Sequence, residues 1–522
     1  MSNVENITKV YLLNVPLEND YKHTLHFTSR DTQYNYFESK IKHQFNDFTY
    51  QRKDNTIRVP MHFDSVYQCN YVMYKNQHYS NKWFYAFITD MEYINDECTK
   101  ITIETDVIQT WYFDYVVKPS FVEREHVSDD TVGLHTVPEL LETGEYKCNG
   151  SFTDKLLEKT TLVIGTTVNL HGENVKGGLY NGIYSALKYY SGTPTTINDF
   201  IHTLTVGNGD GFEGGKADAI NCVFMAPEFL VSDVTLEVGH SETVKYFDVI
   251  REKTVSIDDY FPRNNKLLTF PYNYLLVSNN NGGSSIYKYE FFDGENCDFR
   301  VQGTITPGCS IRLYPMNYKG IGHNYEEGLN LGKYPICNWN TDVYTNWLTQ
   351  NSVNIGLDIA TAGIQIVGGV VGGIVSGGAG LAVGGASALS GVSQVANTLA
   401  QVYTQSFTPP QSKGNTNCGD VITSAKLNTF TYYQMSIRKE YAEIIDSYFD
   451  MFGYKVNIVK QPNKEHRTRY WFTKTIDVNI DGSIPNNDLQ KIKDCYNNGI
   501  TFWRNANEIQ DYSLSNEIYK GW

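Results

Sequence analysis

Two neighbouring stretches, KWFYAFITDMEYI (residues 82–94) and TKITIETDVIQTWYFDY (residues 99–115), decide the expected fold. Their apolar residues alternate with polar ones or run together, and most are aromatic or β-branched, which suits the pleated and half-buried surface of a sheet. Polar residues at 95–98 separate the two stretches, as at a turn. We therefore predict strands over both stretches.

The rest of the chain has a similar composition. Of its 522 residues, 39 are Tyr and 26 are Phe, and this aromatic content favours strands over helices. The length is too great for one ordinary core and predicts roughly two to four domains. We expect a mainly β protein with several β-barrel-like or sandwich-like domains, plus one glycine-rich hydrophobic loop or helical hairpin.

Local patterns divide the chain into five predicted parts. Strand patterns dominate residues 1–127, with one short helix near residues 33–43, and loosen afterwards, with a strand at 160–170 and a helix at 180–190. An amphipathic helix that ends at Gly453 is expected near the carboxy terminus. The parts are an amino-terminal β domain (1–127), an inserted lobe (128–222), a second β domain (223–350), a hydrophobic loop (351–412) and a segment returning to the β core (413–522).

The charge of the chain limits the kinds of partner it can bind. A net charge of −15 at pH 7 argues against a dedicated nucleic-acid clamp, because phosphate binding needs clustered Lys and Arg that release counterions. A conduit along which DNA slides without sticking is compatible with this charge. One basic stretch, KEHRTRYW (residues 464–471), could contact DNA or a neighbouring subunit, although a solvated turn before a strand is the preferred interpretation.

The nine cysteines are scattered along the chain and form no CxxC pair. They indicate neither a disulfide framework nor a zinc site, and we expect buried free thiols in a protein that folds in a reducing cytoplasm. The amino terminus lacks the basic region and apolar core of a secretory signal. Assembly inside the producing cell is therefore expected.

No catalytic, cofactor-binding or metal site is expected. The loop at residues 206–218 superficially suggests a phosphate cradle, but Asp210 stands in place of the first glycine of that motif and Ala217 in place of its Ser or Thr. Zincin, hydrolase and kinase signatures are absent, and the twelve histidines do not cluster at ligand spacing. Asp258 and Asp259 form a carboxylate pair, but such pairs arise by chance among 58 acidic residues.

Residues 355–403 differ from everything around them, because their only charged residue is Asp358. Divided at the glycines near residue 378, the segment gives two arms of about 22 residues, each about 33 Å long if helical, which matches a hydrocarbon core of about 30 Å. Trp347 stands where an interfacial aromatic residue would lie. The residues predicted to be membrane-active are Ile355, Leu357, Ile359, Ile364, Ile366, Val367, Gly368, Gly369, Val370, Val371, Gly372, Gly373, Ile374, Val375, Gly377, Gly380, Leu381, Val383, Gly384, Leu389, Val392, Val395, Leu399 and Tyr403.

The composition of this segment favours conditional rather than permanent insertion into lipid. Glycines at fourfold spacing, such as Gly368 with Gly372, would let helices approach closely in a membrane. Each glycine also costs about 1 kcal/mol in a helix in water, and Gln365, Gln394 and Asn397 lower the hydrophobicity further. A flexible Gly/Ala linker or a buried helical hairpin fits the length and the missing charges equally well.

Several long stretches resemble the tail knob, or distal tube, protein of small short-tailed bacteriophages typified by the phi29-like Bacillus phages. They follow one order and cover most of the chain, residues 128–222 excepted. The stretches are NDYKHTLHFTS (19–29), QYNYF (33–37), YSNKWFYAFITDMEY (79–93), DVIQTWYFD (106–114), SFVEREHV (120–127), NNKLLTFPYNYLLVSNNNG (264–282), IDSYFDMFGYKV (445–456) and GSIPNNDLQKIKDCYNNGITFW (482–503).

The resemblance implies a homo-hexameric tube at the distal end of the virion tail, assembled in the host cytoplasm, through which the genome leaves. It implies that a hydrophobic loop of each subunit plugs the lumen and later forms a pore in the host cytoplasmic membrane. Residues 355–403 occupy the place of that loop. The implied partners are the proximal tail or lower collar protein, a tail-tip protein, viral DNA in transit without sequence specificity, and the host membrane. No enzyme activity and no cofactor are implied.

Two other functions stay open at this point. A tail-tip enzyme that degrades host envelope polysaccharide would need a carboxylate-lined groove, and the sequence gives no signal for one. A bacterial membrane protein with one helical hairpin would be expected to carry basic flanks, which residues 355–403 lack.

Overall fold

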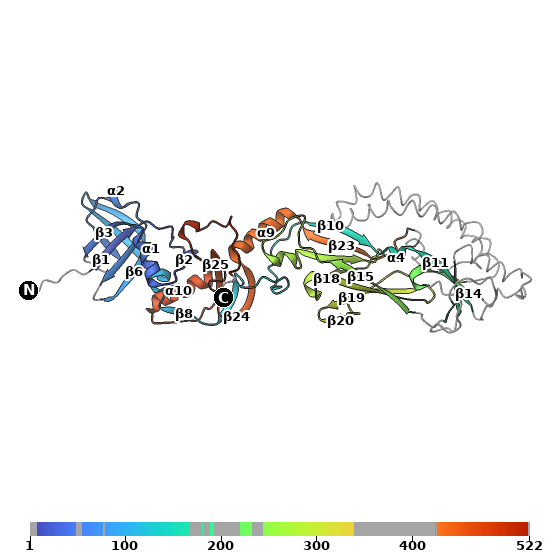
Figure 1. Ribbon diagram of the computed structural model, residues 1–522. Coiled ribbons are helices and arrows are strands. Elements are labelled where there is room, and N and C mark those ends of the chain that lie inside the picture. Colours follow the sequence, from blue (N-terminus) through green and yellow to red (C-terminus); the bar gives the residue numbers. More distant parts are fainter. Residues whose placement is uncertain are drawn as a thin grey trace, which may run out of the picture. The chain divides into compact units, whose positions relative to one another are not determined.

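The computed structural model describes residues 8–48, 55–76, 79–166, 179–181, 188–192, 220–231, 244–338, 423 and 425–519. These residues belong to two units: unit 1 comprises residues 1–142, 263–266 and 443–522, and unit 2 comprises residues 143–262 and 267–442. Strands predominate in both units (Figure 1), so the predicted mainly β fold with several sheets is confirmed. The predicted membrane-active residues and the loop at 206–218 lie outside the described residues.

The two stretches that decide the fold form adjacent antiparallel strands of a six-stranded sheet in unit 1. Successive side chains of a strand point to opposite faces, and here both faces are buried. Val10 and Leu12 join one hydrophobic cluster, whereas Tyr11 and Leu13 join another. In spatial order the strands are β3 (Ile41–Phe48), β1 (Thr8–Leu13), β5 (Tyr71–Asn76), β6 (Tyr79–Asn95), β7 (Cys98–Thr105) and β4 (Thr56–Val59).

Helix caps explain two differences from the sequence prediction in unit 1. The expected helix near residues 33–43 exists as α1 (Arg30–Glu38), and it begins earlier because the Ser29 hydroxyl accepts a hydrogen bond from the backbone N–H of Thr32 at 3.1 Å. The predicted strand over 99–115 is wrong over residues 106–114. There, Asp106 caps a short helix, α3 (Val107–Trp111), whose five residues are all buried.

A second sheet of unit 1 joins segments from both ends of the chain. Its strands β2 and β27 run parallel, with His23 opposite Thr501. The predicted amphipathic helix near the carboxy terminus is confirmed as α9 (Lys439–Phe452), which ends at Gly453 with φ +63°; a Cβ there would collide with the carbonyl of Glu125. In spatial order, the strands of this second sheet are β2 (His23–Leu25), β27 (Ile500–Trp503), β25 (Tyr470–Ile476), β9 (Ser120–Glu125) and β24 (Tyr454–Lys460). Unit 1 also contains the strand pair β26 (Ile480–Gly482) and β8 (Tyr115–Val117) and the helices α2 (Phe63–Val66) and α10 (Asn486–Asn498).

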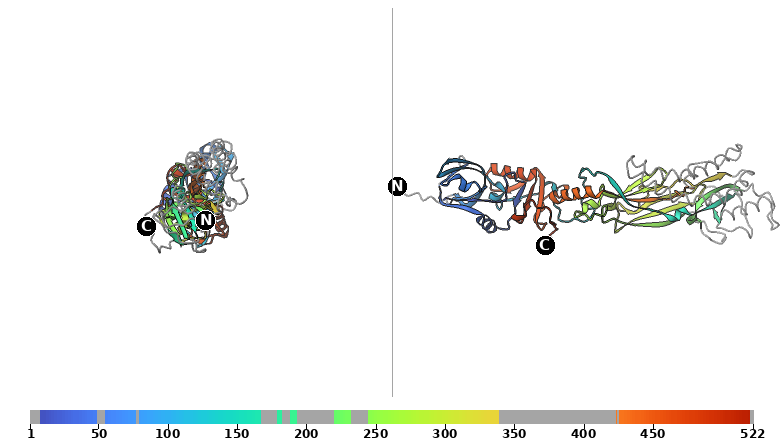
Figure 2. Two further views of the ribbon diagram at one scale, coloured as in Figure 1. Left: turned by 90° about the vertical axis from the view of Figure 1, so that its right-hand side faces the viewer. Right: turned by 90° about the horizontal axis from the view of Figure 1, so that it is seen from above.

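The described residues of unit 2 form three sheets, whose strands run alongside one another in Figure 2. Their inner faces share one hydrophobic cluster that includes Val163, Phe299 and Tyr432. In spatial order, the first sheet consists of β10 (Tyr146–Thr153), β23 (Thr431–Ile437), β16 (Asn273–Ser278) and β17 (Ser284–Tyr287). The second consists of β12 (Leu179–Asn181), β13 (Lys188–Gly192), β11 (Thr160–Thr166), β14 (Ile220–Pro227) and β22 (Ile336–Asn338). The third consists of β15 (Val244–Glu252), β18 (Asn296–Thr304), β19 (Ser310–Tyr318) and β20 (Ile321–His323), with β21 (Leu329–Asn330) beside β19.

The helix predicted at residues 180–190 is wrong in its described parts. Leu179–Asn181 and Lys188–Gly192 are antiparallel partners, with Tyr180 opposite Tyr189. Tyr189 and Tyr190 are both buried. Aromatic residues that fit a sheet outweigh the weak helical pattern at this position.

The predicted free thiols are present at the seven cysteines for which the structure gives the thiol state. Five of them are buried, and Cys98 and Cys148 are half-buried. Burial raises the pKa of the Cys222 thiol to about 11 and the pKa of the Cys297 and Cys309 thiols to about 12. Such thiols are packing groups rather than nucleophiles.

His126 is buried in unit 1 between a strand and a carbonyl group. Its Nδ1 accepts a hydrogen bond from the N–H of Phe472 at 2.7 Å, and its Nε2 donates to the carbonyl of Asp450 at 2.9 Å. Burial, followed by the charge of Arg467, lowers the pKa of His126 to about 3. The folded protein therefore keeps this ring neutral at pH values where an unfolded histidine is charged.

We predict that His126 makes unit 1 less stable as the pH falls from about 6.5 toward 3. The unfolded chain binds a proton in this range and the folded chain does not, which costs up to about 1.4 kcal/mol per pH unit. Asp106 acts in the opposite direction, because burial raises its pKa to about 6. This effect is the same in the parent protein and in a variant at His126, so it cancels when the two are compared. The His126→Gln variant should therefore lose less stability than the parent between pH 7 and pH 5.

Urea titrations followed by tryptophan fluorescence measure this difference. Trp83, Trp111, Trp471 and Trp503 all lie in unit 1. Equal changes of unfolding free energy with pH in the parent and in the variant would contradict the assignment.

Candidate functional site

The candidate site is the part of unit 2 that precedes and follows residues 355–403 in the chain. The segment itself lies outside the described residues, and within the described ranges no helix is both long and apolar enough to cross a bilayer. The structure instead defines the two flanks of the segment, β22 before it and β23 after it.

The flank that precedes the segment is held by main-chain contacts. Strand β22 pairs with β14, with Ile336 opposite Phe224. Just before it, the N–H of Tyr334 donates to the carbonyl of Gly308 at 2.9 Å, and the N–H of Met225 donates to the carbonyl of Pro335 at 3.0 Å. The chain is therefore fixed up to the last described residue before the segment.

The flank that follows the segment is held on both sides. Strand β23 pairs with β10 on one edge and with β16 on the other. The side-chain amide of Asn280 donates to the carbonyl of Thr429 at 2.9 Å and to the hydroxyl of Thr431 at 3.0 Å. Asn280 can make these contacts because it adopts φ +54°, a conformation that asparagine tolerates better than most residues.

A buried polar group also anchors β23 from inside the unit. The hydroxyl of Tyr432, which is fully buried, donates to Asp154 at 2.9 Å. The guanidinium of Arg251 lies 5.0 Å from the ring centres of both Phe152 and Tyr432 and 3.8 Å from the Asp154 carboxylate. Burial raises the pKa of Asp154 to about 6. Removing β23 would leave this carboxylate without its hydrogen bond.

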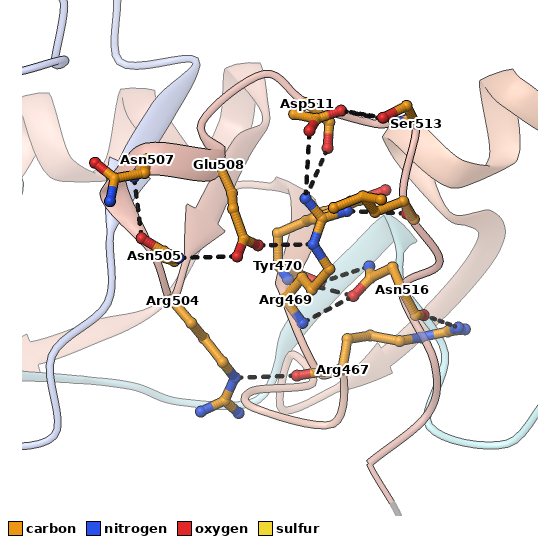
Figure 3. A network of polar contacts seen from close by, with 11 residues as sticks. Arg467, Arg469, Tyr470, Arg504, Asn505, Asn507, Glu508, Asp511, Ser513 and Asn516 are labelled. Carbon is orange, nitrogen blue, oxygen red and sulfur yellow. Dashed lines mark hydrogen bonds and ion pairs between the residues drawn. The ribbon is translucent and has the colours of Figure 1, made fainter.

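The arginines of the basic stretch at residues 464–471 belong to an internal network of polar contacts (Figure 3). The guanidinium of Arg469 contacts the Glu508 carboxylate at 2.7 Å, the Leu514 carbonyl at 2.9 Å and the Asp511 carbonyl at 3.1 Å. Its side chain is only 11% exposed. The turn before strand β25 was predicted, but the prediction that its side chains are solvated is wrong for Arg469.

Arg504 and Arg467 complete this network. Arg504 donates to the carbonyls of Arg467 at 3.0 Å and Glu465 at 2.8 Å, while Arg467 donates to the carbonyl of Asn516 at 3.2 Å. These contacts hold residues 504–516 against strand β25 (Figure 3). The arginines therefore stabilise the carboxy-terminal segment, and backbone carbonyl oxygens occupy several of their N–H donors.

The remaining chemical candidates have structural roles. Asp258 forms an ion pair with Lys147 and accepts a hydrogen bond from the N–H of Lys439 at 3.2 Å. The bond from Lys147 lowers the pKa of Asp258, whereas a general acid needs a raised pKa. Among the described residues, no group of three or more His, Cys, Asp or Glu side chains could hold a metal ion.

Comparisons with known proteins agree with this architecture. Residues 237–517 match the family described as the C-terminal domain of the tail knob protein gp9 of Bacillus phage phi29, which covers more than half of the chain. Residues 6–116 match the family described as the caudoviral major tail protein N-terminus.

Similar proteins extend the match to nearly the whole chain. The tail knob protein gp9 of Bacillus phage B103 is 28% identical over 97% of this chain and 97% of its own length. Its counterpart in Bacillus phage phi29 is 27% identical over 97% of this chain and 98% of its own length. The structure of the bacteriophage C1 tail knob protein, gp12, shares the fold with a TM-score of 0.63 at 14% identity, over 98% of this chain and 100% of that chain. The chain is therefore a structural protein of the phage tail and belongs to the tail knob protein gp9 family of phi29-like Bacillus phages.

Proposed function

We propose that this tail knob protein forms the distal tube of the tail as a homo-hexamer and conducts DNA during genome ejection. In this proposal, residues 355–403 of each copy plug the lumen and later enter the host cytoplasmic membrane. The observation that carries the proposal is the anchoring of both flanks of this segment in unit 2. A proximal tail or lower collar protein and a tail-tip protein are the proposed neighbours, and no catalytic residue is required.

Anchored flanks allow the segment to change its surroundings without loss of the fold. Strands β22 and β23 have their own partners within unit 2, so their pairing does not require residues 339–422 to take one conformation. Transfer of the Ile, Val and Leu side chains into lipid would supply the driving force. The glycine pairs would let segments from different copies pack closely inside the bilayer.

The charge of the chain supports conduction rather than retention of DNA. The net charge is −15, and the guanidinium of Arg469 is already engaged by carboxylate and carbonyl oxygens. A predominantly acidic surface releases few counterions when DNA approaches, so DNA gains little by binding to it.

We predict that purified full-length protein releases dye from vesicles and that replacing residues 355–403 with a Gly/Ser linker of equal length abolishes the release. The linker keeps the spacing between β22 and β23 but removes the side chains that partition into lipid. A second variant, Val371→Asp with Ile374→Asp, should lose most of the release because each buried charge costs several kcal/mol.

The matched control is Tyr67→Ala, which alters an exposed side chain of unit 1 and should leave dye release unchanged. Release that persists at full rate in the linker variant would refute the membrane step.

We also predict that Arg469→Gln destabilises unit 1 without changing the affinity for DNA. The substitution breaks a mostly buried network and should lower the unfolding free energy by about 2–4 kcal/mol. Urea titration and a duplex DNA binding assay measure the two effects. Arg58→Gln, at an exposed position of β4, is the control and should change neither. A large drop in DNA affinity for Arg469→Gln alone would show that this arginine contacts DNA.

A further inference from the structure

One face of the sheet β15–β18–β19–β20 in unit 2 carries an ordered array of aromatic and charged side chains. The opposite face supplies the buried residues Phe299, Val301 and Leu313 to the core. On the outer face, the strand register places Asp248 opposite Arg300 and Arg300 opposite Tyr314. These three residues therefore form one row across three strands, because opposed residues of antiparallel strands share a face.

The charges in this row are tied together. The guanidinium of Arg300 forms a bidentate pair with the Asp248 carboxylate, at 2.6 Å from Nε and 2.8 Å from Nη2. The hydrogen bond from Arg300 lowers the pKa of Asp248. The Arg300 side chain is 19% exposed, but that of Asp248 is 47% exposed. The pair is thus neutral as a whole, with the carboxylate partly open to solvent.

Aromatic rings flank this pair on both sides. The ring of Tyr246 lies 4.0 Å from the Arg300 guanidinium, and Tyr246 is 60% exposed. On the other side, the ring of Tyr325 packs against that of the buried Tyr314 at 4.5 Å and remains 50% exposed. His323, which contacts Arg300 at 3.3 Å, lies nearly parallel to Tyr325 at 6.2 Å.

The spacing of the exposed rings follows from the sheet. Tyr246 belongs to β15, and Tyr325 covers Tyr314 of β19, two strands away. Two strand spacings correspond to about 10 Å across the sheet, and Tyr246 lies two residues along β15 from Asp248. Both rings are held by neighbours, so little conformational entropy is lost when a ligand covers them.

This combination disfavours nucleic acid and protein as occupants. Phosphate recognition needs a free cation, and the charge of Arg300 is neutralised by Asp248. A protein partner would have to place hydrogen-bond donors on the half-exposed carboxylate of Asp248, because burying it with unsatisfied lone pairs is costly. A polyhydroxylated ligand would replace the lost water with its own hydroxyl groups and could cover the rings with its C–H faces.

We propose that this face binds a short segment of uncharged polysaccharide, with sugar rings on Tyr246 and Tyr325 and hydroxyl groups on Asp248 and His323. This binding is independent of DNA conduction and of the membrane step. It requires no catalysis, because the Asp248 carboxylate is held ionised by Arg300 and serves only as a hydrogen-bond acceptor.

Affinity electrophoresis of the full-length protein tests this proposal. Native gels would contain a neutral polysaccharide (dextran, a linear β-glucan, mannan or galactan) or the anionic polygalacturonate. We expect retardation in at least one neutral polysaccharide, weakened at least tenfold by Tyr246→Ala and by Tyr325→Ala. The variant Asp248→Asn keeps the shape of the side chain and should also weaken binding. Tyr67→Ala, another exposed tyrosine, should leave it unchanged.

Two outcomes would overturn the proposal. The first is unretarded migration of the parent in all four neutral gels, with or without retardation in polygalacturonate. The second is a change in oligomer mass, measured by mass photometry, that accompanies the Tyr246 and Tyr325 substitutions, which would assign the face to a protein contact. Unchanged melting temperatures of the variants would establish that any loss of binding does not come from unfolding.

Discussion

Strand pairing at both ends of the hydrophobic segment is the constraint on which the rest of the structure depends. The described chain nearest to residues 355–403 on either side keeps its backbone polar groups paired, and unpaired groups in a buried place would cost about 1–3 kcal/mol each. Strand β23 satisfies its backbone through two partners, β10 and β16, and β22 through β14. The tail knob fold thus holds both flanks within unit 2, and this arrangement supports the proposal that the segment acts apart from the sheets.

Buried ionic groups give unit 1 a comparable rigidity. The carboxylate of Glu139 is fully buried and is bound by Arg124, by Lys266 and by the N–H of Lys455 at 2.9 Å. Asp446 likewise accepts hydrogen bonds from the N–H groups of Arg263 and Asn264. Residues 263–266 therefore join unit 1 although the chain before and after them belongs to unit 2. Such satisfied networks fix one arrangement of distant segments, and removing one partner leaves a buried charge unpaired.

The sequence predicted those parts in which local pattern and burial agree. Aromatic alternation located β6 and β7, and the glycine at 453 located the end of α9. The pattern failed where all sides of an element are buried, as in α3, because a short apolar run does not distinguish a helix from a strand. It also failed for Arg469, whose partners Glu508, Asp511 and Leu514 lie about forty residues away, so its burial depends on tertiary contacts. The face around Tyr246 and Tyr325 required the strand register, which no local pattern contains.

Hydrogen exchange of the full-length protein, followed by mass spectrometry with and without lipid vesicles, tests the central claim most directly. The proposed mechanism predicts that amides in β22 and β23 exchange slowly in both conditions, while those in residues 355–403 become protected only when vesicles are present. Protection in 355–403 that vesicles do not change would contradict entry into lipid. Loss of protection in β23 upon vesicle binding would contradict the claim that the segment is released from a unit that stays folded.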